Sequence, residues 1–141
     1  MISLKILEKE VGKLGFKTSI EKTEYGDVVF FEVPVKDRSQ KCIVKVSDHD
    51  QYGKIVEVVS VVGELDKSDI RKGLENLMAL LMLNQHLITA KTQLDQKGEK
   101  MYIVARTLAP SCTPKELGAM IQEVAIYADV LEQKLLGVDK A

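Results

Sequence analysis

The chain has 141 residues, of which 45% are hydrophobic and 29% are charged, and its formal net charge is −1. These values are ordinary for a folded protein, so we expect residues 1–141 to form a single domain with a proper core. Nucleic-acid binding is not expected, because it needs clustered Lys and Arg in excess. No apolar run reaches transmembrane length, so association with a membrane is not expected either.

The N-terminus and the cysteine content indicate a cytoplasmic protein. The first residues enter an amphipathic pattern that carries Glu8 and Glu10, whereas a signal peptide needs an uninterrupted apolar core. Cys42 and Cys112 are too few for a disulfide framework, although a single bridge between them stays open. A reducing cytoplasm is therefore the expected compartment.

The first half of the chain predicts one helix followed by four strands. Ser3 is placed to cap a helix over residues 4–14, and Gly15 to end it. Alternating and β-branched stretches then predict strands at 16–22, 28–35, 42–46 and 55–62, separated by polar turns at 24–27, 36–40 and 47–53. Pro34 puts the end of its strand at a sheet edge or bulge. The strand 55–62 is apolar on both faces and should be central.

A second helix and two more strands follow. Asp66 or Ser68 is expected to cap a helix over about 69–85, whose core stripe consists of Ile70, Leu74, Leu77 and Leu81. Strands are predicted at 88–94 and 101–108, joined by a turn at 95–98.

The clearest helix in the sequence is the last one, from Thr113 to about Leu136. Thr113, Pro114 and Glu116 form a capping box with a proline at the first helical position, and Gly137 supplies a stop. An apolar stripe at three- and four-residue steps should face the core: Leu117, Ile121, Val124, Ala128, Leu131 and Leu135, widened by Met120 and Tyr127.

The predicted order α-ββββ-α-ββ-α defines an α+β fold. Links between successive strands are too short for parallel crossovers, so neighbouring strands should be antiparallel. We expect a single antiparallel sheet with the helices packed on it.

No motif in the sequence indicates catalysis, a metal or a cofactor. The loop 48–53 begins like a calcium loop, but Tyr52 and Val59 occupy positions that need ligands. His49, His86 and the two cysteines lack the paired spacing of a zinc site. Cys112 lies just before the cap of the last helix, where the helix N-terminus can lower a thiol pKa, and it is a candidate reactive thiol. We expect no enzyme and no cofactor.

Two helices carry more apolar residues than one core-facing stripe requires. These surplus residues are Ala79, Met82 and Leu83 in the second helix and Ala119, Ile126 and Val130 in the last. A helix with two apolar faces must bury both, either inside the monomer or against another chain. We favour an interface of a homodimer or with a partner, since most soluble oligomers are symmetric dimers.

The order of elements resembles that of the class I type III secretion chaperones and the related YbjN-like family. The segments that carry the resemblance are Leu14-Gly15-Phe16, Leu80-Leu81-Met82-Leu83-Asn84 leading to Leu87, Leu94-Asp95-Gln96-Lys97-Gly98 and Val104-Ala105-Arg106-Thr107-Leu108. It implies a small intracellular homodimer without enzymatic activity, in which the second helix contributes to the dimer interface. The secretion chaperones are usually strongly acidic, so a net charge of −1 favours a more general protein-binding or regulatory module.

Two functions follow as hypotheses. The first is a non-catalytic, chaperone-like or regulatory homodimer that binds a peptide segment of an unidentified partner. The second is a small-molecule-binding protein or enzyme with a pocket between the sheet and the last helix, for which Cys112 is the candidate reactive group.

Overall fold

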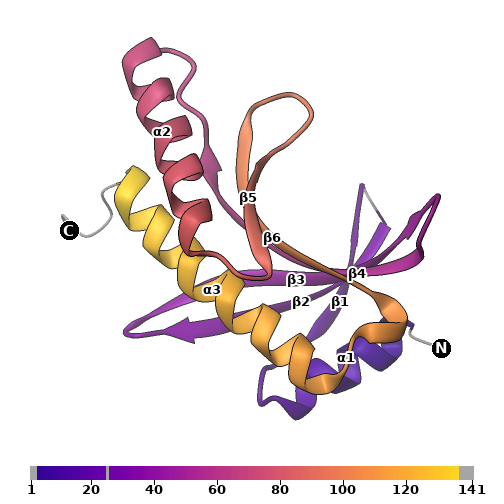
Figure 1. Cartoon of the computed structure of the whole chain (residues 1–141). Coiled ribbons are helices and arrows are strands. Elements are labelled where there is room, and N and C mark those ends of the chain that lie inside the picture. Colours follow the sequence, from indigo (N-terminus) through magenta and orange to yellow (C-terminus); the bar gives the residue numbers. More distant parts are fainter. Residues whose placement is uncertain (1–2, 25, 137–141) are drawn as a thin grey trace.

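The computed structural model describes residues 3–24 and 26–136 and has the predicted α+β fold. Three helices and a six-stranded antiparallel sheet follow one another in the order α-ββββ-α-ββ-α (Figure 1). The helices α1 (Leu4–Lys13) and α3 (Pro114–Leu136) pack on one face of the sheet, and α2 (Ile70–Leu83) extends beyond it. No helix of the described residues is long and apolar enough to span a bilayer.

The sheet order is β1-β2-β3-β4-β6-β5, with every neighbouring pair antiparallel. The strands are β1 (Ser19–Thr23), β2 (Gly26–Val35), β3 (Arg38–His49), β4 (Gly53–Glu64), β5 (Ala90–Leu94) and β6 (Lys100–Leu108). The central position predicted for the fourth strand is confirmed, because β4 pairs with β3 and β6. Pro34 lies where β2 has pairing on one side only, since β1 reaches no further than Phe30.

The predicted turns are longer than the observed ones. Arg38 already pairs with Val35, so the β2–β3 turn consists of two residues, the first of which, Lys36, has a positive φ of 59°. The loop expected at 47–53 shrinks to residues 50–52, because cross-strand pairing outweighs the polar character of the flanking residues. Of the predicted 24–27 turn, Tyr25 lies outside the described residues, and Gly26 adopts the expected positive φ.

The first strand begins later than the alternation predicts. Phe16 precedes β1 and stacks on Phe31 with ring centroids 5.5 Å apart. It thus fills the space between α1 and the sheet instead of pairing with β2. At the start of α1, Ser3 Oγ accepts a hydrogen bond from Ile6 N at 3.3 Å, which confirms the predicted cap.

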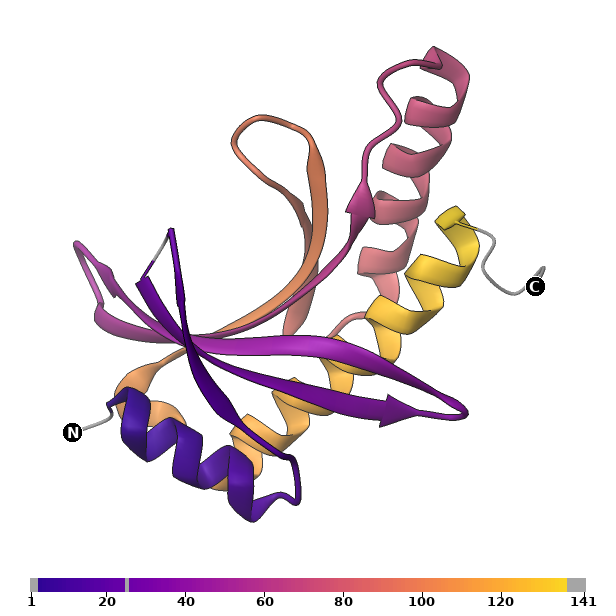
Figure 2. The same ribbon diagram turned by 180° about the vertical axis from the view of Figure 1, so that it is seen from behind.

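The helix α3 crosses the sheet and provides much of the core (Figure 2). Thr113 Oγ1 accepts a hydrogen bond from Glu116 N at 3.1 Å, as the capping box predicts. The predicted stripe is confirmed, with Leu117, Ile121, Val124, Ala128 and Leu131 buried and Leu135 partly buried. The predicted stop, Gly137, lies outside the described residues.

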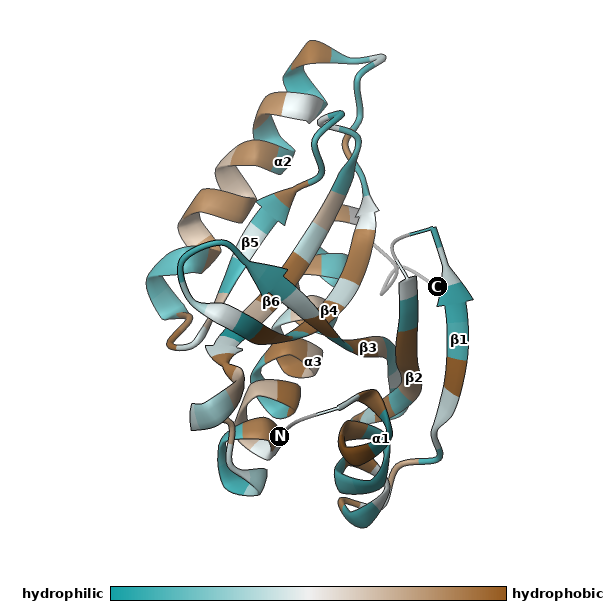
Figure 3. Ribbon diagram, turned by 90° about the vertical axis from the view of Figure 1, so that its right-hand side faces the viewer, coloured by the Kyte–Doolittle hydropathy of each residue, from teal (hydrophilic) through white to brown (hydrophobic). Residues whose placement is uncertain are grey.

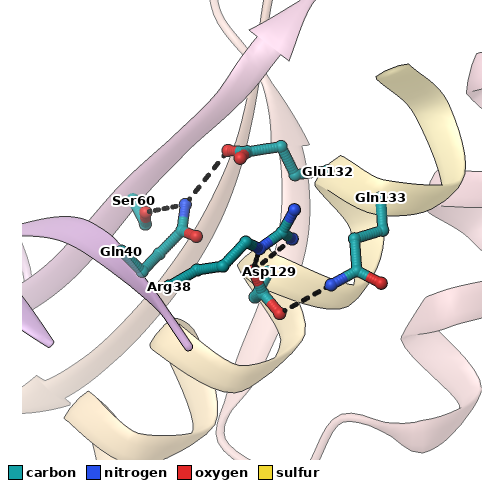
Figure 4. Close-up of polar contacts among 6 residues, drawn as sticks. All are labelled: Arg38, Gln40, Ser60, Asp129, Glu132 and Gln133. Atoms are coloured by element: carbon teal, nitrogen blue, oxygen red, sulfur yellow. Dashed lines mark hydrogen bonds and ion pairs between the residues drawn. The ribbon is translucent and has the colours of Figure 1, made fainter. Parts of the chain in front are cut away.

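A polar cluster fixes the second half of α3 on the sheet (Figure 4). The guanidinium of Arg38, at the start of β3, donates to Asp129 Oδ1, with the Nε contact at 3.0 Å, and Gln133 donates to the other oxygen of Asp129 at 3.1 Å. Gln40 Nε2 bridges Ser60 Oγ in β4 and Glu132 in α3, at 3.3 Å each. Within the described residues every buried side-chain polar atom has a partner, so the cluster sets the position of α3 without an unsatisfied group.

Candidate interaction surface

The start of α2 is set by Asp69, not by Asp66 or Ser68 as predicted. The Asp69 carboxylate accepts hydrogen bonds from the backbone N–H groups of Arg71 at 3.0 Å and Lys72 at 3.3 Å. Asp66 instead accepts from the hydroxyl and the backbone N–H of Ser68, and the hydroxyl bond is the main cause that lowers the pKa of Asp66. Asp66 and Ser68 therefore shape the linker between β4 and α2, and Asp69 at the end of this linker caps the helix.

The rotation of α2 about its axis is fixed by three buried residues, Gly73, Leu80 and Leu83. A Cβ added at Gly73 would lie 2.7 Å from the carbonyl oxygen of Asp66, so only glycine allows this close approach between helix and linker. At the other end, Thr92 Oγ1 donates to the Leu80 carbonyl at 3.0 Å. These contacts turn the opposite side of α2 outward.

The C-terminal end of α2 is tied to the β5 edge of the sheet. After α2 a short 3-10 helix, η1 (Asn84–His86), leads to β5, and Asn84 Oδ1 accepts a hydrogen bond from Thr92 N at 2.8 Å. The Glu123 carboxylate of α3 accepts from the backbone of Ile88 and Thr89, each at 2.8 Å, and from Ala90 N at 2.6 Å. The edge groups of this corner are therefore satisfied by side chains from both helices.

The outward side of α2 is an apolar face, which we define by Ile70, Leu74, Met78, Leu81 and Met82 (Figure 3). Ile70 is 81% exposed and Leu81 is 70% exposed, although the periodicity places both in the core stripe. That prediction was wrong, because α2 is apolar nearly all round and periodicity cannot choose between its faces. A contiguous apolar face of this kind marks an interaction site.

The six residues predicted as an interface fall into three groups. Met82 is 55% exposed, and on α3 Ile126, Val130 and Ala119 also face outward. Ala79 is partly buried against the core. Leu83 is only 7% exposed and belongs to the core, so its placement on a free face is corrected.

A groove of about 810 Å³ runs beside the apolar face of α2. Its walls come from α2, from the linker between β4 and α2 and from the end of α3. The apolar residues that line it are Leu65, Met78, Ala79, Met82 and Leu135. The charged residues that line it are Glu64, Asp66, Lys67, Lys72, Glu75 and Lys134, three of each sign. Methionine side chains adapt to varied apolar partners, which suits a protein-binding groove.

The two cysteines are free and lack the electrostatics of reactive thiols. Cys112 follows the 3-10 helix η2 (Ala109–Ser111) and is partly buried. Burial, helped by the carboxylate of Glu116, raises the pKa of Cys112 to about 11, against the expectation that the helix N-terminus would lower it. Burial raises the pKa of Cys42 to about 12. Neither thiol is poised as a nucleophile at neutral pH.

The histidines lie apart from any ligand set. His49, at the end of β3, packs against Tyr52 with ring centroids 5.0 Å apart, and its Nδ1 accepts a hydrogen bond from Gln51 N. His86 is exposed in η1. No group of three or more His, Cys, Asp or Glu that could hold a metal occurs in the part of the chain that the structure describes.

The fold of this chain is similar to that of a protein of known structure. Neither a family model nor a curated protein matches the chain. Among solved structures, the crystal structure of YbjN from E. coli, described as a candidate transcription regulator, matches with a TM-score of 0.56 at 11% sequence identity. The match covers 99% of this chain and 92% of YbjN.

The chain has a YbjN-like fold. The resemblance found in the sequence is thus confirmed for the YbjN-like branch at the level of the fold. At this identity the likeness concerns the arrangement of elements and leaves the activity to be argued from the surface.

Proposed function

We propose that this protein is a non-catalytic binding module of a chaperone-like or regulatory kind, which acts as a homodimer and binds a peptide segment of a partner protein. The observation that carries the proposal is the exposed apolar face of α2. Full burial of an aliphatic side chain contributes about 1.5–3 kcal/mol before the cost of association is subtracted, so covering this face favours binding.

Two further observations support the proposal. The YbjN-like neighbour is described as a candidate regulator, which agrees with a binding role rather than a catalytic one. The free cysteines suit the reducing cytoplasm, where we place the protein. For the alternative, a small-molecule-binding protein or enzyme, the raised pKa of Cys112 speaks against the use of that thiol as a nucleophile.

We assign the two exposed apolar surfaces to different partners according to their size. The apolar face of α2 is the larger and forms the dimer, while the outward stripe of α3, made of Ala119, Ile126 and Val130, remains for the partner segment. An extended or helical segment with apolar anchors at matching spacing would bind there.

The dimer is tested by light scattering coupled to size exclusion. The wild type should have twice the 15.7 kDa mass of one chain. Leu74→Glu and Met82→Glu replace exposed residues and should give folded monomers, whereas Leu83→Glu should unfold the domain because Leu83 is buried. A wild type that stays monomeric at high concentration rejects the homodimer.

The partner segment is tested separately on the α3 stripe. Ile126→Glu should leave the dimer mass unchanged and abolish co-purification of a bound protein from the native cell. Retention of the same bound protein by this variant would remove α3 from the binding site.

A further inference from the structure

The face of the sheet that carries no helix contains an apolar band. In an antiparallel sheet with one face packed on helices, the other face normally alternates to polar residues. Here an apolar band crosses four strands, since the register places Phe30 opposite Ile43, Ile43 opposite Val59, and Val59 opposite Val104. Val61, further along β4, is 50% exposed. Within the band Val104 is buried, Phe30, Ile43 and Val59 are half-buried, and Val61 is the most exposed member.

The band forms the floor of a trough of about 1110 Å³. One wall is the β1–β2 hairpin, with Thr23 and Glu24, and the other is the β5–β6 hairpin, residues 95–100. In Figures 1 and 2 these two hairpins rise from opposite sides of the twisted sheet.

The charges at the border of the band are engaged with one another. Glu57 accepts hydrogen bonds from Arg106 Nε and from Ser47 Oγ, and it lies 3.8 Å from Lys45 Nζ. Burial works to raise the pKa of Glu57, but these partners outweigh it and hold the pKa below its ordinary value. Arg106 also contacts Gln93 at 3.4 Å. Further charged residues, among them Lys41, Asp95 and Lys100, also line the trough, so a fitting occupant is apolar toward the floor and polar toward the rim.

The chain itself carries such an occupant. The second half of α2 belongs to a run from Asn76 to Ile88 without Asp, Glu, Lys or Arg, and the charged residues of the helix, Arg71, Lys72 and Glu75, lie in its first half. The outward residues Met78, Leu81 and Met82 lack cover in the monomer. The 14 residues of α2 form a helix about 21 Å long and about 10 Å wide, dimensions that suit a sheet face.

We propose that α2 of a second copy lies in this trough, and that α2 of the first copy lies in the trough of the second in the same way. The proposal rests on the homodimer proposed above and names the surface that α2 meets. Such a contact is isologous and closes at two chains.

The buried area favours exchange over packing of the two α2 helices on each other. The five residues of the α2 face can bury on the order of 100 Å² each. Helix-to-helix packing alone would then bury on the order of 1,000 Å² in total, less than the roughly 1,200–2,000 Å² of stable interfaces. Placing each α2 in the trough of the other copy adds the accessible surface of both troughs and brings the total toward this range.

Two single variants test the exchange by mass measurement. Leu81→Glu places a charge on the apolar face of α2, and Val61→Glu places a charge in the trough. Both positions are exposed, so water can solvate the new carboxylate in the monomer. Both variants should convert the dimer to a folded monomer of 15.7 kDa, checked by circular dichroism. Ile6→Glu, an equally drastic change on α1 at the other end of the molecule, is the control and should leave the dimer intact.

Complementation gives the decisive result. A mixture of the Leu81→Glu and Val61→Glu chains should form a heterodimer, since the intact α2 of the second fits the intact trough of the first, while neither variant dimerises alone. If Val61→Glu remains dimeric while Leu81→Glu is monomeric, the exchange is refuted and the α2 dimer survives. If the wild type is monomeric, both proposals fall.

Discussion

Glu123 on α3 accepts a 2.6 Å hydrogen bond from the backbone N–H of Ala90, the first residue of the edge strand β5. The same carboxylate also holds the backbone of Ile88 and Thr89. One side chain thereby ties together the loop after α2, the sheet edge and the long helix.

We predict that Glu123→Gln lowers the free energy of unfolding by about 1–3 kcal/mol at pH 7, because the new amide NH₂ cannot accept the backbone hydrogen bonds. Partial burial works to raise the pKa of Glu123, but the hydrogen bonds from Ile88, Thr89 and Ala90 lower it overall. A lowered pKa means that the stabilisation is present above the unfolded-chain value near ~4.3 and is lost as the pH falls through the lower folded value.

Urea unfolding of both proteins at pH 7 and pH 3 checks this. The difference in the free energy of unfolding between the wild type and Glu123→Gln should be smaller at pH 3 than at pH 7. Equal gaps at the two pH values would mean that the charge of Glu123 contributes nothing. Gln122→Glu, at the exposed neighbouring position, serves as the control.

The ion pair between Arg38 and Asp129 should respond asymmetrically to mutation. The Asp129 side chain is 4% exposed and that of Arg38 is 29% exposed. Arg38→Leu leaves a buried carboxylate with Gln133 as its remaining partner and should cost about 3–5 kcal/mol. Asp129→Leu should cost less, since the guanidinium can reach water.

A double-mutant cycle measures this pair. The variant that carries both leucines should be more stable than Arg38→Leu alone, because no charge is then left buried. Additive losses would show that the two residues do not interact energetically.

Two glycines in helices should give opposite results when changed to alanine. Gly73→Ala should destabilise the domain by about 1–3 kcal/mol, because the methyl group would meet the Asp66 carbonyl oxygen. Gly12→Ala in α1 meets nothing within 4 Å and should stabilise it by about 0.5–1 kcal/mol. Thermal unfolding of the two variants measures both changes in stability. Stabilisation by Gly73→Ala would show that the Asp66 carbonyl oxygen does not lie against Gly73.

Thiol labelling should be slow. With a pKa of about 11, Cys112 should react with iodoacetamide at pH 8 on the order of a hundredfold more slowly than a free peptide thiol. The Cys112→Ser variant separates the labelling of Cys112 from that of Cys42. Labelling at the rate of the free peptide would revive the reactive-thiol hypothesis.

The sequence predicts the parts of this fold whose signals are local. Thr113 and Ser3 cap their helices as expected, and the single stripe of α3 is buried. The rotation of α2 could not be predicted, because leucines and methionines lie on all its sides and the choice depends on Gly73 fitting against a distant carbonyl group. The absence of charge from Asn76 to Ile88 was the available signal for an interface.

Contacts between distant residues were likewise beyond sequence reasoning. The apolar band on the open sheet face appears only when the strand register is known, since Phe30, Ile43 and Val104 come from three separate stretches of the chain. Burial next to Glu116 likewise reverses the expected effect of a helix N-terminus on Cys112.

The two margins of the sheet differ in a way that limits how copies can polymerise. At β5 the N–H groups of Ala90 and Thr92 are already occupied by Glu123 and Asn84, so no foreign strand can use them. At β1, five exposed residues leave the outer margin accessible. Molecules that met through strands could therefore join only on the β1 side of the sheet.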